Sequence, residues 1–344
     1  MGNLLPSVKK QRYSGVELLR IIAMFAIMLG HSHYSFSSLP DSATISIHPI
    51  ASFLDLFFRS ITVIGVNIFI AISGWYGIKF RIEGFLKYIF QVFFISICTY
   101  CVMFACGMAS FSKDAIMQTL TFYDGYWFVV GYMGLYIFSP LLNSFIEHSA
   151  KKEFQLLLFC IFLFQSYYSW LSSWYDYFGG YSIFLFMLIY LVSAYVRKYS
   201  PRLLSHNIEM KWIVLLLVQA LVELIFLYYF DNAGRQFRYD NPISIATAVI
   251  AVMYSEHFRW SNRIINWLAA SCFTVYLLHF NPLVYPYFRK ITKYAYESSN
   301  DIYYVVFIFA ILLGVYLIST LLDQIRITSW SLCCKKIFQR IKQS

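Results

Sequence analysis

The stretch VELLRIIAMFAIMLGHSHYSF, residues 16–36, decides how this chain folds. It is apolar and long enough to cross a bilayer as a helix, which takes about 20 residues. Arg20 and His31 interrupt it eleven residues apart. Eleven helical steps of about 100° bring the two side chains to within about 20° of one face, about 16 Å apart along the axis. Ionisable groups inside such a segment mark functional sites by default, so we expect this face to meet polar partners inside a helix bundle.

Two residues near the start of this helix are expected to support it. Glu17 lies three residues before Arg20, a spacing that predicts an ion pair on one face of the helix. Ser14 and Glu17 also have the spacing of a capping box at a helix start. A purely structural explanation is also open. An arginine near one end of a membrane helix can extend its charge to the interface, and a histidine near the other end can cap the helix.

Composition indicates a membrane protein. Hydrophobic residues make up 60% of the 344 and charged residues only 13%, against about 45–50% and 25% in soluble domains. The chain therefore has little room for a soluble domain. We expect an all-α fold, a polytopic bundle of about ten transmembrane helices. The expected spans are 16–36, 57–78, 88–109, 126–145, 154–171, 181–196, 212–230, 242–258, 264–285 and 302–322.

Lysine and arginine predict the orientation of this bundle. With the N terminus inside, the inner segments hold 19 of them and the outer segments 6. Cytoplasmic loops carry such an excess, so both termini are expected in the cytoplasm. The net charge of +10 then follows from topology and contact with anionic lipid, and we expect no nucleic-acid partner.

No linker divides the chain, and no repeat period is evident. We expect one membrane domain over residues 1–344, with a helical bundle at 11–325 and a basic cytoplasmic tail at 326–344. The tail is amphipathic from Thr328 onward, which favours a position on the inner leaflet.

Four motifs follow one another along the chain. They are LLR at 18–20 with His31, GVNIFIAISGW at 65–75, YWFVVGY at 126–132 with LY at 135–136 and SPL at 139–141, and FTVYLLH at 273–279. In this order they resemble the acyltransferase-3 family, multi-pass enzymes that O-acylate sugars of surface polysaccharides, lipopolysaccharide or peptidoglycan precursors. The chain departs from the family at Asn67, where an aspartate is common. It also departs after Arg81, where a second arginine at short spacing is common.

The resemblance implies an O-acyltransferase, most simply an O-acetyltransferase, with acyl-CoA as donor and a cell-envelope glycan as acceptor. His31 would be the base for the acceptor hydroxyl or a covalent relay of the acyl group. Arg20 would contact a phosphate or the thioester of the donor, a task that suits its forked guanidinium. Glu17 would orient Arg20, which makes these three the expected catalytic residues.

Four further residues are candidates for substrate binding: Arg81, Ser73, Trp127 and His279. Each has a structural alternative except Arg81, which the resemblance places at the donor. Ser73 suits close packing of helices, and Trp127 suits a ring at the membrane interface. His279 lies ahead of Pro282 and either contacts the acceptor or caps a helix end.

We expect no metal and no bound cofactor, with acetyl-CoA or another acyl-CoA as donor substrate. The expected partners are this donor, a glycan or lipid-linked sugar acceptor and membrane lipids, in a bacterial plasma or inner membrane. A lipid-linked sugar flippase or transporter and a polysaccharide polymerase are the alternatives. A transporter would show repeats with broken helices, and a polymerase would show a larger, arginine-rich outer loop.

Overall fold

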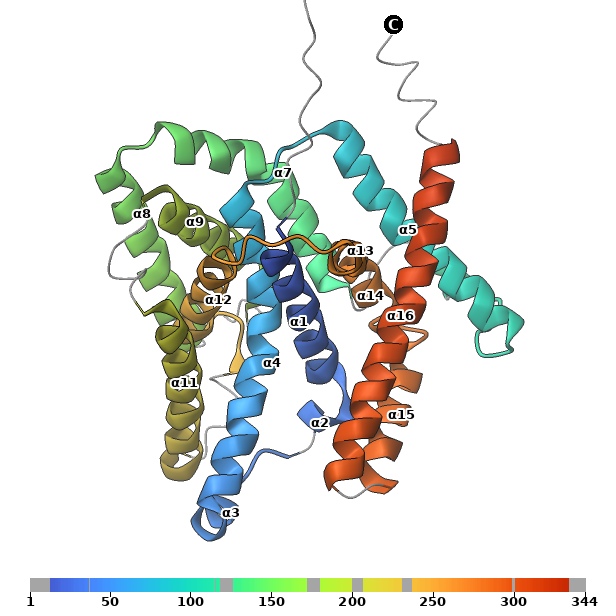
Figure 1. The fold of residues 1–344 in the computed structure, drawn as a ribbon, viewed down its shortest axis with the longest axis horizontal. Helices are drawn as coiled ribbons and strands as arrows, with labels where there is room; N and C mark the ends of the chain where they lie inside the picture. Colours follow the sequence, from blue (N-terminus) through green and yellow to red (C-terminus); the bar gives the residue numbers. More distant parts are fainter. Residues whose placement is uncertain are drawn as a thin grey trace, which may run out of the picture.

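Two helices, α1 (Ser14–His31) and α4 (Pro49–Tyr76), lie side by side in the interior of the bundle (Figure 1). The computed structural model describes residues 13–36, 38–114, 116–117, 126–171, 180–199, 207–230, 237–298 and 301–333. Three helices pack on the other faces of α4: α9 (Ile183–Tyr199), α11 (Ile208–Phe230) and α12 (Pro242–Ser255). The predicted first span therefore lies at the core, as its charged residues require.

The other side of α1 faces a second group of helices (Figure 1). These are α5 (Ile82–Ala105), α13 (Arg263–Ala270), α14 (Cys272–His279), α15 (Tyr285–Ser298) and α16 (Asp301–Cys333). The periphery and connections are α2 (His33–Phe36), α3 (Ser42–Ile47), α7 (Trp127–His148), α8 (Lys151–Phe164) and the π-helical η1 (Gln165–Leu171). In this arrangement α14 packs against α1, α5 and α16.

The expected all-helical fold is confirmed for the described residues, which form helices and no strand. Six helices in these residues are long and apolar enough to cross a membrane: α1, α4, α5, α7, α11 and residues 303–332 of α16. The remaining expected spans form shorter or broken helices, so the count of about ten stays a prediction. The cytoplasmic location of the termini also stays a prediction.

Three local expectations differ from the structure. Residues 264–285 do not form one helix, because the chain turns at Ser271 between α13 and α14. α16 continues to Cys333, past residue 325 where we expected the bundle to end; the tail beyond Cys333 lies outside the described residues. Ser14 does not cap α1. Its hydroxyl instead donates to Oδ1 of Asn266 at 2.8 Å, which joins α1 to α13.

Two glycines of α4 allow neighbouring helices to approach closely. A Cβ at Gly65 would lie 2.8 Å from the carbonyl oxygen of Ala23 in α1, and one at Gly74 would collide with the backbone of Tyr190 in α9. Small residues serve this purpose in membrane bundles. α4 is therefore fixed against α1 on one face and α9 on another.

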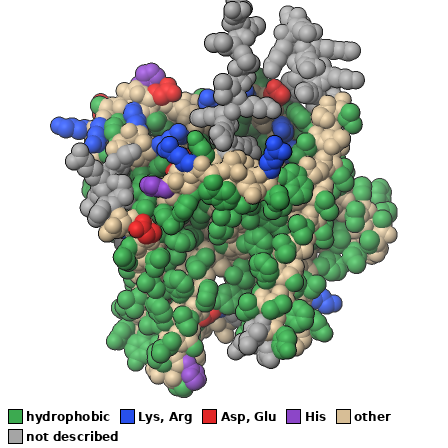
Figure 2. Space-filling model, in the orientation of Figure 1, with side chains coloured by type: hydrophobic (Ala, Val, Ile, Leu, Met, Phe, Trp, Pro, Cys, Tyr) green, Lys and Arg blue, Asp and Glu red, His purple; other side chains and the backbone are tan. Residues whose placement is uncertain are grey.

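The outer surface of the bundle is apolar (Figure 2). Ile97 of α5, Leu217 of α11 and Leu317 of α16 are among its exposed side chains. Lysine and arginine gather mainly towards the end at which α16 finishes (Figure 2). A charged end on an apolar body is the expected surface of a protein that crosses a bilayer.

Candidate active site

His31, the last residue of α1, is the centre of the candidate site. The helix ends after it because Ser32 has extended backbone, and the Ser32 hydroxyl donates to the carbonyl of Leu29 at 2.7 Å. The imidazole ring stacks on Phe280 with ring centroids 4.3 Å apart. These contacts fix the ring at the end of the helix.

A second histidine binds His31 directly. Nδ1 of His31 lies 3.0 Å from Nε2 of His279, and Nδ1 of His279 lies 2.6 Å from the carbonyl oxygen of Val275. A carbonyl only accepts, so Nδ1 of His279 carries a proton, and in the neutral ring Nε2 is then an acceptor. His31 must donate to it from Nδ1. We therefore assign the free lone pair of neutral His31 to Nε2.

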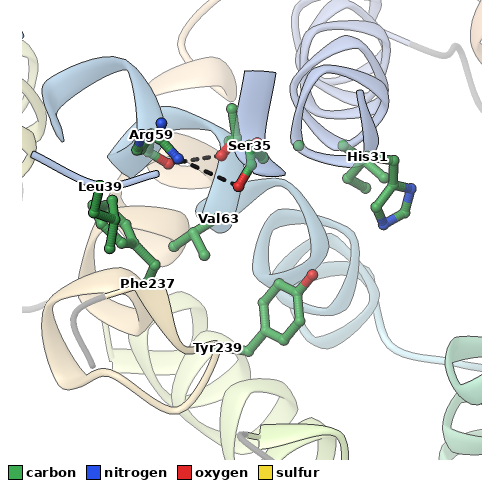
Figure 3. Close-up of a pocket in the computed structure, with 10 residues that line it drawn as sticks. His31, Ser35, Leu39, Arg59, Val63, Phe237 and Tyr239 are labelled. Atoms are coloured by element: carbon green, nitrogen blue, oxygen red, sulfur yellow. Dashed lines mark hydrogen bonds between the residues drawn. The ribbon is translucent and has the colours of Figure 1, made fainter. Parts of the chain in front are cut away.

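His31 lines two cavities. The polar cavity has a volume of about 280 Å³, and Ser35, Arg59 and Tyr239 are among its walls (Figure 3). The apolar cavity has a volume of about 40 Å³. Its other walls are Met24, Ile27, Val66, Phe69, Trp127, Phe128, Phe273 and Tyr276. His31 thus lies where a polar and an apolar compartment meet.

Arg59 is the charged residue of the polar cavity. Its Nε lies 2.9 Å from Oδ2 of Asp55 one turn earlier. Nη1 donates to the carbonyl of Ser35 at 3.3 Å (Figure 3). Tyr34 donates to the other carboxylate oxygen of Asp55 at 2.7 Å. The guanidinium therefore ties α4 to the segment after α1, and the charge at the wall of the polar cavity is paired.

Arg20 and Glu17 form the ion pair that their spacing predicts. Nη1 of Arg20 lies 3.1 Å from Oε2 and 3.2 Å from Oε1 of Glu17. The Glu17 side chain is 8% exposed and that of Arg20 29%. The guanidinium is also within electrostatic reach of the hydroxyls of Tyr76 and Tyr132. Arg20 is therefore accessible, while its partner is buried.

A third cavity lies beside this end of the bundle and is basic. It has a volume of about 440 Å³, and its charged walls are Lys79, Arg197 and Lys198 together with one acidic residue, Glu147. Tyr76, which also lines it, is within electrostatic reach of both Arg197 and Arg20. The basic cavity therefore adjoins the Arg20 end of α1, about three helical turns from His31.

Two of the four substrate-binding candidates, His279 and Trp127, lie beside His31, and the other two, Ser73 and Arg81, do not. His279 is fully buried against His31, and Trp127 is a wall of the apolar cavity rather than a ring on the surface. The Ser73 hydroxyl lies 3.1 Å from that of Tyr132 and 3.0 Å from the carbonyl oxygen of Phe69, and it lines none of the three cavities. Arg81 has an exposed side chain at the start of α5 and lines none of the three cavities.

A buried polar cluster that the sequence analysis missed holds α14 in place. Asp323 of α16 accepts hydrogen bonds from Ser271, the residue just before α14, at 3.0 Å and from Thr274, in the first turn of α14, at 2.6 Å. It also pairs with Arg326 at 2.8 Å. α14 ends at His279, so this cluster positions the partner of His31. The sequence did carry a signal for this cluster, because Asp323 and Arg326 lie three residues apart at the end of an apolar run.

Tyr239 and Phe237, which line the polar cavity, also escaped the sequence analysis. They lie in a turn before α12, where neither periodicity nor a motif marks them. The turn is held by Asn67, whose side-chain amide donates to the Tyr239 carbonyl at 2.9 Å. The amide of Asn67 therefore positions a wall of the polar cavity, a hydrogen bond that an ionised aspartate at this position could not donate.

Comparison with known proteins gives one match. A family model described as an acyltransferase domain matches residues 13–322. That range contains α1 to α15 and most of α16, and with them all three cavities. No curated protein and no solved structure matches this chain.

Proposed function

We infer the function of this chain from the premise that it belongs to the acyltransferase-3 family, whose domain covers residues 13–322. The chain is a membrane acyltransferase. More finely, we propose that it transfers an acetyl group from acetyl-CoA to a hydroxyl of a cell-envelope glycan, in a bacterial plasma membrane. The observation that carries this proposal is the position of His31, which joins two cavities and keeps a lone pair on Nε2.

The proposed reaction uses His31 as general base. Nε2 takes the proton of the acceptor hydroxyl as its oxygen attacks the thioester carbonyl, and the imidazolium then protonates the departing thiolate. One ester bond forms, one thioester bond breaks, and free CoA leaves. His279 accepts from Nδ1 throughout and so keeps the ring in its orientation. A covalent acyl group on His31 is the alternative path.

The basic cavity supports a donor that carries phosphates. Lys79, Arg197 and Lys198 supply cationic walls near the Arg20 end of α1, and such groups suit phosphate oxygens. Acyl-CoA bound there would extend its thioester past Arg20 towards His31. In the predicted orientation this cavity faces the cytoplasm, where acyl-CoA is made.

The polar cavity supports a sugar as acceptor. Its volume of about 280 Å³ and its polar groups, among them Thr62 and Tyr239 next to His31, suit a molecule with several hydroxyls. Arg59 is paired with Asp55, so the cavity wall carries no uncompensated charge from this pair. The proposed acceptor is a hydroxyl of a glycan or of a lipid-linked sugar.

A deletion strain tests the proposed function. Surface glycans of strains without the gene, with the wild-type gene and with His31→Ala are compared by NMR before and after mild alkali. We expect an alkali-labile acyl group only with the wild-type gene, at equal protein levels in the membrane. Unchanged acylation with less or shorter glycan would overturn the proposal in favour of transport or polymerisation. The break between α13 and α14 is a feature that a transporter would share.

His279 is expected to act through His31, and two substitutions separate this role from packing. His279→Ala removes the acceptor for Nδ1 and frees the ring to turn, so we expect acyl transfer to fall about 10²–10⁴-fold, the upper figure being the effect of losing the tautomer-holding residue of a catalytic triad. His279→Gln offers an amide oxygen at the same place and should restore a large part of the rate. Equal loss in both variants would assign a different role to His279.

A further inference from the structure

We infer that the apolar cavity beside His31 limits the transferred acyl group to about two carbons, and that Phe69 and Val66 of α4 are the residues that set this limit. The inference rests on the proposed function, because it names the part of the same site that receives the acyl chain. It assigns acyl-length specificity to named side chains.

The apolar cavity lies along the face of α1 that joins Arg20 to His31. Arg20, Met24, Ile27 and His31 follow at intervals of four, three and four residues, the spacing of one face of a helix. Met24 and Ile27 line the apolar cavity, so the cavity lies along the stripe that leads from the proposed donor contact to the proposed base. An acyl group whose carbonyl reaches His31 from the Arg20 end has this cavity beside it.

The apolar cavity is small. The cavity measures about 40 Å³, whereas a cavity of about 150 Å³ in another protein takes up benzene, with six carbons. By that ratio about two heavy atoms fit, enough for a methyl and part of its carbonyl. A butyryl chain would need two more methylenes than the cavity accommodates.

The walls of the apolar cavity are tightly packed. Met24 is 2% and Val66 4% exposed, and Gly65 brings α4 into close contact with α1 at this level. Opposite them, the rings of Phe128 and Tyr276 lie 5.5 Å apart. A closely packed interior resists an added methylene, so a longer chain cannot simply push the walls apart.

Phe69 offers the clearest test. Phe69 is half-buried and lines the cavity. It is not one of the two rings of the Phe128–Tyr276 pair, so its removal leaves that pair in place. Phe69→Ala should enlarge the cavity by several methylenes. Phe25→Ala is the matched control, because Phe25 lies on α1 but stacks on Tyr316 of α16, with centroids 5.3 Å apart, and does not line the cavity.

The experiment supplies membranes that contain each variant and the native glycan with equal concentrations of acetyl-CoA and butyryl-CoA. The acids released by mild alkali are then measured by gas chromatography. We expect wild type and Phe25→Ala to transfer acetyl almost alone, and Phe69→Ala to raise the ratio of butyryl to acetyl at least tenfold, since one methylene in a pocket discriminates by about 10–200-fold. Val66→Ala, with propionyl-CoA, repeats the test if Phe69→Ala does not reach the membrane.

Three outcomes decide the question. Equal transfer of butyryl and acetyl by wild type would overturn the inference, as would equal shifts in Phe69→Ala and Phe25→Ala. No transfer from acetyl-CoA by wild type, although the glycan is otherwise acylated in cells, would overturn the proposed donor instead. The failure of this inference is thus distinguishable from the failure of the proposed function.

Discussion

Substitution of His31 by alanine is expected to abolish acylation of the glycan, with a fall in initial rate of roughly 10²–10⁴-fold, the usual contribution of a general base. Among the described residues, His31 is the one histidine that lines the polar or the apolar cavity. His279 keeps an acceptor lone pair on Nε2, but its ring is fully buried and lines neither cavity, so we do not expect it to replace the lost base. The measurement is incorporation of radiolabelled acetate into the alkali-labile fraction of the envelope, at equal protein levels.

His33 supplies the matched control for this substitution. It lies two residues after His31, beyond the break at Ser32, and its ring packs edge-on against Tyr296 with centroids 5.4 Å apart. It lines neither cavity next to His31. We expect His33→Ala to keep most of the activity. Equal loss in His31→Ala and His33→Ala, with normal insertion of both, would remove the role assigned to His31.

Arg20→Ala is expected to have the second large effect, a loss of acyl transfer of at least about 10²-fold, as for removal of a donor to a transition-state oxyanion. The reason is that the accessible guanidinium, one helical turn before Met24 in the wall of the apolar cavity, is proposed to hold the donor. The measurement is the initial rate against acetyl-CoA concentration in membranes. A contact made with the donor in both ground and transition states raises KM, whereas one made only in the transition state lowers kcat.

The buried partner of Arg20 complicates this substitution and also provides its control. Arg20→Ala leaves the carboxylate of Glu17, which is 8% exposed, without its counter-ion, and an unpaired buried charge is destabilising. Arg20→Gln combined with Glu17→Gln removes both charges and should insert normally yet stay inactive. Glu17→Gln alone should keep a measurable part of the rate. Recovery of activity in the double variant would show that Arg20 matters for stability alone.

The local part of the candidate site could be predicted from the sequence. A helix places residues three, four and eleven apart on one face whatever surrounds it. For this reason the pair Arg20–Glu17 was predicted and is present, and the pair Arg59–Asp55 has the same kind of local spacing. The prediction that polar residues of the first span face the interior holds for Glu17, which is buried against the bundle. Periodicity and apolar composition likewise determined an all-helical membrane fold.

Longer-range features followed only from the tertiary structure. His31 and His279 are 248 residues apart, and their contact depends on the break between α13 and α14, which a run of apolar residues does not reveal. That break is stabilised by Asp323, from a third helix. Arg326, expected at the start of the basic cytoplasmic tail, is instead buried in α16, where it pairs with Asp323.

Local sequence was enough to predict an all-helical chain, the charged face of α1 and its ion pair, because these depend on residues within a few turns of one another. The free nitrogen of His31, the places of the three cavities and the side chains that limit their size became visible in the folded bundle alone. Those properties depend on how helices distant in sequence pack together. A cavity is the space that this packing leaves, and no periodicity along one helix specifies it.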